Sequence, residues 1–229
     1  TKAGASAFMR DCFRVLKPGG IIRVAVPDLE NIVRAYLAAL DRAAAGSAEG
    51  AANHEWMMLE MYDQSIRNCS GGDMAAYLFQ ESVPDKEFIV GMIGDEAARL
   101  MGQAERKREK SRLMPPALRT TLKERLRNII QYCFPSREQR RERRIWRMLG
   151  TEHSALQVGR FRQSGQIHLY MYDRYSLRIL LQRCGFTGIL QRTATESAVP
   201  GWAEFCLDSA PSGTVYKPDS LYMEAVKPS

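Results

Sequence analysis

The sequence predicts a mixed α/β fold, because a few short apolar runs are separated by longer stretches with helical spacing. The run at 21–26 is apolar except for Arg23, which is typical of a strand buried on both faces of a helix-covered sheet. The segments 186–195 and 220–226 are predicted to be two further strands. Most of the chain between 29 and 150 shows helical periodicity. The sequence therefore predicts a small sheet with a long helical segment between its strands.

Caps and breaks mark the ends of the predicted helices. A Pro-Gly-Gly at 18–20 follows the first helix, and a Gly/Ser-rich loop at 46–50 follows the second. Near the C-terminus, Asp173 suits an N-cap and Gly185 suits a helix stop. The predicted helices cover 5–16, 29–45, 53–67, 73–81, much of 95–149, and the stretch between Asp173 and Gly185.

The composition excludes several classes of protein. Of 229 residues, 45% are hydrophobic and 26% are charged, as in globular domains. No stretch approaches the roughly 20 consecutive apolar residues of a membrane-spanning helix, and the first residues lack the apolar core of a signal peptide. The five cysteines and three histidines are scattered, so we expect free thiols, a cytoplasmic location and no metal site.

Positive charge is concentrated in one segment. The whole chain carries +7, whereas residues 105–147 hold 15 Lys and Arg against 5 Glu, a local charge of +10. Such a run suggests contact with phosphates or anionic lipids. A solvated helix face is the commoner explanation, and Tyr132, Phe134 and Trp146 form no evident stacking platform. Nucleic acid is therefore not the expected partner.

Several stretches together resemble class I S-adenosylmethionine-dependent methyltransferases. "VLKPGG", followed by an apolar strand and Pro-Asp, resembles the segment leading into the fifth strand of that family. "SLRILLQRCGF" and "SLYMEAVKP" resemble its last helix and closing strand hairpin. "YDQSIRNCSGGDMAAYL", "GQIHLYMYDRYSLRILLQRCGF" and "VYKPDSLYMEAVKP" look like a bacterial subgroup with a helical insertion after the fifth strand.

The resemblance implies the C-terminal half of a Rossmann-like methyltransferase sheet with a large helical insertion. Residues 1–28 would hold the fifth strand, 29–150 the insertion with its Arg-rich part at 105–147, and 151–229 the last helix and hairpin. The strand at 220–226 is then expected between the other two and antiparallel to the first.

The resemblance also implies that the cofactor-binding half is absent. In the family, a glycine-rich loop and an acidic residue in the first half of the sheet hold S-adenosylmethionine. This sequence has no G-x-G-x-x-G. We therefore expect a fragment that binds S-adenosylmethionine weakly or not at all and is inactive alone. Its strand at 21–26 would lack a neighbour, and such an exposed edge favours self-association.

Asp28 follows the predicted strand at 21–26, and two roles are open to it. Ligands of open α/β sheets bind outside the carboxyl ends of the strands, so Asp28 would face that crevice. Asp at this position also caps the following helix. The two roles are compatible, and capping is the more ordinary one.

His168, Tyr170, Tyr172 and Asp173 form the densest cluster of polar and aromatic residues. The resemblance places this stretch beside the pocket of the methyl acceptor. There His168 would serve as a base, since the imidazole pKa lies near neutrality, and the other three residues would bind substrate. In the alternative interpretation, the tyrosines pack, Asp173 caps a helix and His168 is solvated.

Tyr62, Asp63 and Arg67 lie at helical spacing in the insertion. Asp63 and Arg67 are four residues apart, so the simplest interpretation is a surface ion pair. The more specific hypothesis places Tyr62 and Arg67 in the lining of the acceptor pocket.

Two hypotheses of function follow. The first is the acceptor-side part of a methyltransferase that acts on a small or sugar-like molecule. The second is a non-enzymatic basic helical module that binds nucleic acid or an anionic membrane surface. The C-terminal motifs favour the first hypothesis, and the Arg-rich run alone favours the second.

Overall fold

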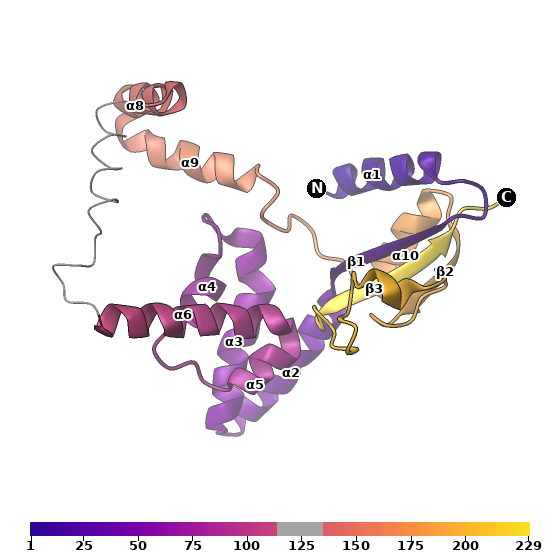
Figure 1. Cartoon of the computed structure of the whole chain (residues 1–229), viewed down its shortest axis with the longest axis horizontal. Coiled ribbons are helices and arrows are strands. Elements are labelled where there is room, and N and C mark those ends of the chain that lie inside the picture. The colour runs from indigo at the N-terminus through magenta and orange to yellow at the C-terminus, as the bar shows by residue number, and fades with distance from the viewer. Residues whose placement is uncertain (114–134) are drawn as a thin grey trace.

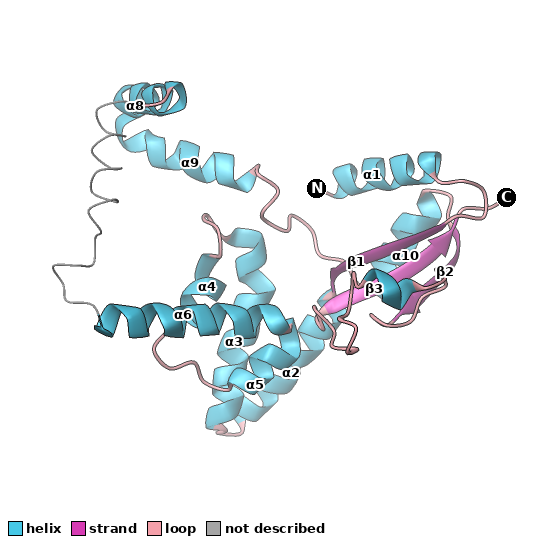
Figure 2. Cartoon of the chain, viewed as in Figure 1, coloured by secondary structure: helices cyan, strands magenta, loops and turns pink. Residues whose placement is uncertain are grey.

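The computed structural model describes residues 1–113 and 135–229. The described chain is mixed α/β, with a large group of helices to one side of a small sheet (Figure 2). Part of the Arg-rich segment, including Cys133, Tyr132 and Phe134, lies outside the described residues. The three strands of the sheet are β1 (Ile21–Pro27), β2 (Thr187–Arg192) and β3 (Ser220–Val226).

The sheet has the order β1-β3-β2, and β3 runs antiparallel to both neighbours. The prediction that the last strand lies between the other two is confirmed. Along β1 the register is regular from Ile21, opposite Val226, to Pro27, opposite Ser220. The pairing of β2 shifts around Gly188, whose φ of +57° is a conformation that glycine adopts without strain.

The turn before β1 depends on its glycines. Gly19 has a φ of +74°, and a Cβ on Gly20 would lie 2.8 Å from the carbonyl oxygen of Lys17. The turn is tied to the end of β3, because the backbone N–H of Gly19 donates to Lys227 at 2.8 Å and that of Lys227 donates to Gly20 at 2.9 Å. The Pro-Gly-Gly sequence therefore closes the helix and sets the start of the strand.

The helices agree with the predicted layout and extend it. Two helices that were not predicted appear at 86–93 and 153–162, so helical structure continues past residue 150, where the insertion was expected to end. The described α-helices are α1 (Lys2–Val15), α2 (Leu29–Ala44), α3 (Ala48–Ile66), α4 (Gly72–Leu78), α5 (Lys86–Ile93), α6 (Asp95–Leu113), α8 (Arg137–Leu149), α9 (His153–Arg162) and α10 (Arg174–Arg183).

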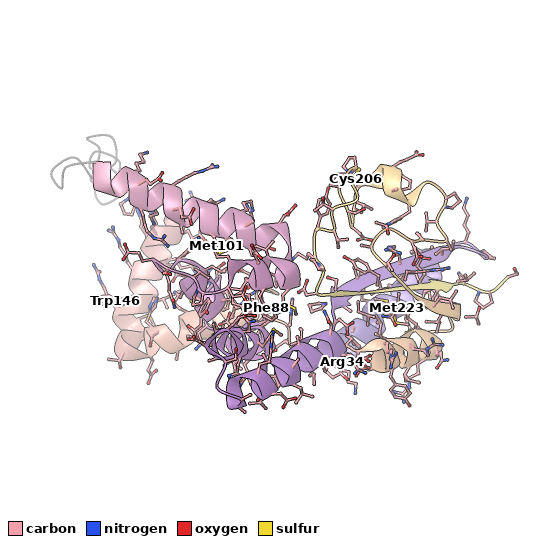
Figure 3. The ribbon with its side chains drawn as sticks, turned by 90° about the horizontal axis from the view of Figure 1, so that it is seen from below. Arg34, Phe88, Met101, Trp146, Cys206 and Met223 are labelled. Carbon is pink, nitrogen blue, oxygen red and sulfur yellow. The ribbon has the colours of Figure 1, made fainter. Side chains whose placement is uncertain are left out.

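The sheet and the insertion each have their own core. Side chains of β1 and β3 pack with α1 and α10 in the first core, where Met223 and Leu181 are fully buried. The second core lies among α2 to α6 and contains Trp56, Met57 and Ile32. Figure 3 shows Met223 in the sheet and Phe88 and Met101 among the insertion helices. The two cores meet at the carboxyl end of β1, from which α2 starts directly.

Helices α8 and α9 form an arm apart from both cores (Figure 1). No residue of α8 or α9 is buried. The two helices are held together by Glu142, which accepts a hydrogen bond from Arg160 at 2.7 Å. The backbone of α8 is stabilised by a capping box between Ser136 and Gln139.

Candidate functional site

A cavity of about 420 Å³ lies where the two cores meet. Residues 25–27 at the carboxyl end of β1 form one side, and apolar side chains of α4, α5 and α6, such as Met74 and Ile93, form the other. The volume lies in the range of small-molecule sites. Its polar lining comes from four segments far apart in sequence: Gln64, Arg67, Glu96, His168, Lys217, Asp219 and Ser220.

His168 is held against the insertion and lines the cavity. Its backbone N–H donates to the carbonyl of Gln64 in α3 at 2.8 Å. Its Nδ1 atom is buried and has no hydrogen-bond partner. Burial, together with the positive charges of Arg67 and Lys217, lowers the pKa of His168 below its usual value. The imidazole is therefore neutral at pH 7 and able to accept a proton.

Arg67 ends α3 and also lines the cavity. One guanidinium nitrogen donates to the carbonyl of Gln166, while the buried Nε atom has no partner. Arg67 makes no ion pair within the described part of the chain. The predicted surface pair of Asp63 with Arg67 is wrong, because Asp63 is buried and turns the other way.

Asp63 instead holds the start of α4. Its carboxylate accepts hydrogen bonds from the backbone N–H groups of Asp73, at 2.8 Å, and Met74, at 3.4 Å. A side chain at Gly72 would collide with this carboxylate. The Gly-Gly sequence therefore lets the loop close on Asp63, which explains both the glycines and the burial of the acid.

Two buried acids near the cavity were not predicted from the sequence. Asp219, which precedes β3, lines the cavity with only 7% of its surface exposed, and its Oδ1 atom has no partner. Glu60 in α3 is fully buried and accepts a hydrogen bond from Trp56 Nε1 at 2.8 Å, but its Oε1 atom has no partner. The only sequence signal for Glu60 is its i, i+4 spacing from Trp56.

The protonation of these acids follows from burial. Burial and the neighbouring charge of Asp219 raise the pKa of Glu60 to about 8. Burial also raises the pKa of Asp219, although Lys217 opposes this effect. Lys217 itself is exposed and forms an ion pair with Glu96 at 3.1 Å. At neutral pH, Glu60 is therefore mostly protonated, and Asp219 is the acid of the two whose charge raises the pKa of the other.

Asp28 and Asp173 are helix caps. The carboxylate of Asp28 accepts from Glu30 N at 3.0 Å, and Asp173 forms a capping box with Ser176. Asp28 lies next to the cavity rather than in its lining, since its backbone N–H donates to the carbonyl of Asp219 at 2.8 Å. Capping, the more ordinary of the two roles considered for Asp28, is the one seen in its contacts.

The three tyrosines lie outside the cavity lining. Tyr172 is buried in the sheet core, and its ring contacts that of Tyr170 with centroids 4.7 Å apart. The carbonyl of Tyr172 accepts from Leu29 N at 3.0 Å, which ties this segment to the end of β1. Tyr62 is 51% exposed on α3. The structure thus brings together His168 and Arg67 among the predicted site residues.

A second charged cluster centres on Arg23 and covers the face of the sheet that points away from α1 and α10. Its guanidinium donates to Asp208 at 2.7 Å, to Glu224 at 2.8 Å and to backbone carbonyls of the β2–β3 connection. Although burial acts in the opposite direction, hydrogen bonds from Ser197, Ala198 and Arg23 lower the pKa of Glu224. The single charge in the apolar run of β1 is therefore fully partnered.

Other kinds of site have little support. Within residues 1–113 and 135–229, no group of three or more His, Cys, Asp or Glu side chains is arranged to hold a metal ion. The four described cysteines are free thiols. No described helix has the length and apolar character to cross a bilayer.

Comparison of the chain with protein-family models, with curated proteins and with solved structures gave no match.

Proposed function

We propose that this chain is the C-terminal, acceptor-side part of an S-adenosylmethionine-dependent methyltransferase that acts on a small or sugar-like molecule. The observation that carries the proposal is the cavity at the carboxyl end of β1, where a neutral His168 lies beside Arg67. In open α/β sheets, ligands bind outside the carboxyl ends of the strands.

The sheet adds support. The order β1-β3-β2, with β3 reversed, is the order that the resemblance implies for the last three strands of the family. The helix after β1 leads into a helical insertion, and the helix α10 precedes the final hairpin, again as implied. Strand order alone does not define an activity, so the site carries the argument.

The residues of this chain can bind, orient and deprotonate an acceptor. Arg67 lines the cavity and offers its guanidinium group to an oxygen of the bound molecule. Met74, Leu78 and Ile93 form an apolar wall that excludes water. As a hydroxyl or amine of the acceptor becomes a nucleophile, its proton would pass to a ring nitrogen of His168, and Nδ1 has no competing partner.

The residues present do not fit S-adenosylmethionine. Gly71, which lines the cavity, and Gly72 form a glycine pair that packs against Asp63. The backbone N–H groups of Asp73 and Met74, which follow the pair, already donate to the carboxylate of Asp63. The loop therefore repels rather than cradles a further carboxylate or phosphate. We derive no methyl-transfer step within this chain, and the cofactor site is proposed to lie on residues outside these 229.

The test is the protein sequence encoded directly before Thr1. We expect a strand, a glycine-rich loop and a helix there, and the longer protein should transfer a labelled methyl group from S-adenosylmethionine to a small-molecule fraction. His168→Gln should lower the rate while leaving the melting temperature nearly unchanged; Arg34→Gln, an exposed position on α2, is the control. Absence of a glycine-rich loop, or no binding of the methyl donor by the longer protein, would overturn the proposal.

A second candidate function rests on α8. Its 13 residues include Arg137, Arg140, Arg141, Arg144 and Arg147, and none of its residues is buried, so packing of the fold does not account for them. Arginines four residues apart repel one another, and a polyanion would relieve that repulsion. In this alternative the chain is a non-enzymatic module that binds nucleic acid or an anionic membrane surface.

Salt dependence separates the two functions. If α8 binds nucleic acid, the affinity for a labelled single-stranded RNA should fall steeply with salt concentration. The double variant Arg140→Gln, Arg144→Gln should bind this RNA more weakly than the unsubstituted chain at the same salt concentration. If α8 binds membranes, the chain should float with anionic vesicles and should not bind the RNA. No binding of either polyanion at low salt would remove this candidate.

A further inference from the structure

Two opposite charges line the cavity without neutralising each other. Arg67 comes from the end of α3 and Asp219 from the residue before β3. Neither is within ion-pair distance of the other, and neither has another ion-pair partner in the described part of the chain. Each also retains a buried polar atom without a hydrogen bond, Nε of Arg67 and Oδ1 of Asp219. Such atoms are rare in folded proteins because each is costly to bury.

The neighbouring charges do not remove the need for a partner. Lys217, the other cation in the lining, is engaged by Glu96 at 3.1 Å. The charge of Asp219 raises the pKa of Glu60, but Glu60 is itself an acid and cannot neutralise a carboxylate. The cavity lining thus offers a donor at Arg67 and an acceptor at Asp219.

We propose that the cavity binds an amphoteric small molecule, with an anionic group toward Arg67 and an ammonium group toward Asp219. This inference takes the cavity of the proposed function as its site and defines the chemistry of the acceptor. The apolar wall formed by Met74, Leu78 and Ile93 would contact the carbon skeleton of the ligand. A phosphorylated amino sugar belongs to this class and is small enough for a cavity of about 420 Å³.

Four sugars test the two ends separately: glucosamine 6-phosphate, glucose 6-phosphate, glucosamine and glucose. Affinity is measured by calorimetry on the 229-residue chain without any methyl donor. We expect glucosamine 6-phosphate to bind best, and removal of either the phosphate or the amine to weaken binding about tenfold or more, as expected for one charged hydrogen bond.

Substitutions assign each preference to a residue. Arg67→Gln should abolish the preference for phosphate and keep the preference for the amine. Arg67→Lys, which keeps the positive charge, should retain part of the preference for phosphate. Asp219→Asn, which keeps the shape of the side chain, should abolish only the preference for the amine. Arg34→Gln is the control, since Arg34 is exposed and pairs with Glu30 on α2.

The outcomes are distinct from those of the methyl-transfer test. Equal binding of all four sugars, no binding of any of them by the unsubstituted chain, or loss of both preferences with either substitution would each overturn the inference. These measurements need no methyl donor, so a failure of methyl transfer in the longer protein leaves the binding result standing. If the chain shows both expected sugar preferences but the longer protein transfers no methyl group, the methyltransferase proposal is rejected and the proposed binding site stands.

Discussion

The two arginines Arg23 and Arg67 differ in how completely they are partnered. Arg23, with its side chain 5% exposed, donates to two carboxylates and to backbone carbonyls, and every guanidinium nitrogen has a partner. Arg67 makes one hydrogen bond to a carbonyl and leaves Nε unpaired beside a cavity. One arginine connects the sheet to the β2–β3 connection, whereas the other lines the cavity.

The difference indicates what each group is for. A buried charge whose hydrogen bonds are all satisfied within the protein stabilises one packing arrangement. A charge left partly unsatisfied destabilises the protein unless a ligand supplies the missing partner. Arg67, His168 and Asp219 gather such unpaired atoms around one cavity, and the Arg23 cluster has none among the atoms of its two acids.

The largest expected effect is therefore the loss of Arg23. Arg23→Met keeps most of the side-chain volume but leaves Asp208 without its counter-charge and Glu224 with Arg192 as its remaining one, at 3.2 Å. We expect the free energy of unfolding to fall by about 3–5 kcal/mol, as for one partner removed from a buried ion pair. Urea denaturation followed by circular dichroism measures this. Arg34→Met, at an exposed pair, is the control, and a loss for Arg23→Met as small as that of the control would contradict the comparison.

The next effect concerns Glu60 and depends on pH. Its pKa in the folded protein, about 8, lies above its ordinary value, so its contribution to stability is complete at low pH and is lost as the pH rises toward 8. The stability of the unsubstituted protein should fall by about 3–4 kcal/mol between pH 5 and pH 8 relative to Glu60→Gln.

Glu60→Gln keeps an oxygen that can accept the hydrogen bond from Trp56. Glu55→Gln, at an exposed position of the same helix, is the matched control. If the stability difference between the unsubstituted protein and Glu60→Gln does not change with pH, Glu60 is not a buried neutral acid.

A smaller effect is expected at the edge of the sheet, where the polar groups are backbone atoms. β1 pairs with β3 on one side, and no other described strand pairs with it on the other. Phe8, Val15 and Leu37 are also more than half exposed on α1 and α2. We expect self-association at about tens of micromolar, a range where unpaired edges associate. Light scattering that shows a monodisperse monomer there would contradict this expectation.

Much of the fold was predictable because its signals are local. The Pro-Gly-Gly turn, the apolar run of β1 and the cap at Asp173 depend on a few neighbouring residues, and each is confirmed. The order of the strands came from the family resemblance, since local pattern does not determine which strand lies in the middle. The helices α5 and α9 were missed because short helices with weak periodicity resemble loops.

The candidate site was predictable only in part because it is formed by tertiary packing. His168 and Arg67 stood out as polar residues within unusual stretches, and both line the cavity. Asp219 and Glu60 gave no such signal, since a single acid in a sequence looks like a surface residue until its burial is known. The same limit explains the error at Asp63, whose spacing fits a surface ion pair but whose contacts are with α4.

The most direct test of the account is the stability of Asp219→Asn with and without glucosamine 6-phosphate. Without the sugar, the variant should be at least as stable toward urea as the unsubstituted protein, because no hydrogen bond to Oδ1 is lost. With the sugar at about 100 times its dissociation constant, the unsubstituted protein should gain about 2.7 kcal/mol and the variant much less. The account is contradicted if Asp219→Asn without the sugar is several kcal/mol less stable than the unsubstituted protein, or if the sugar stabilises both proteins equally. Either result would show that Asp219 supports the fold and not a ligand.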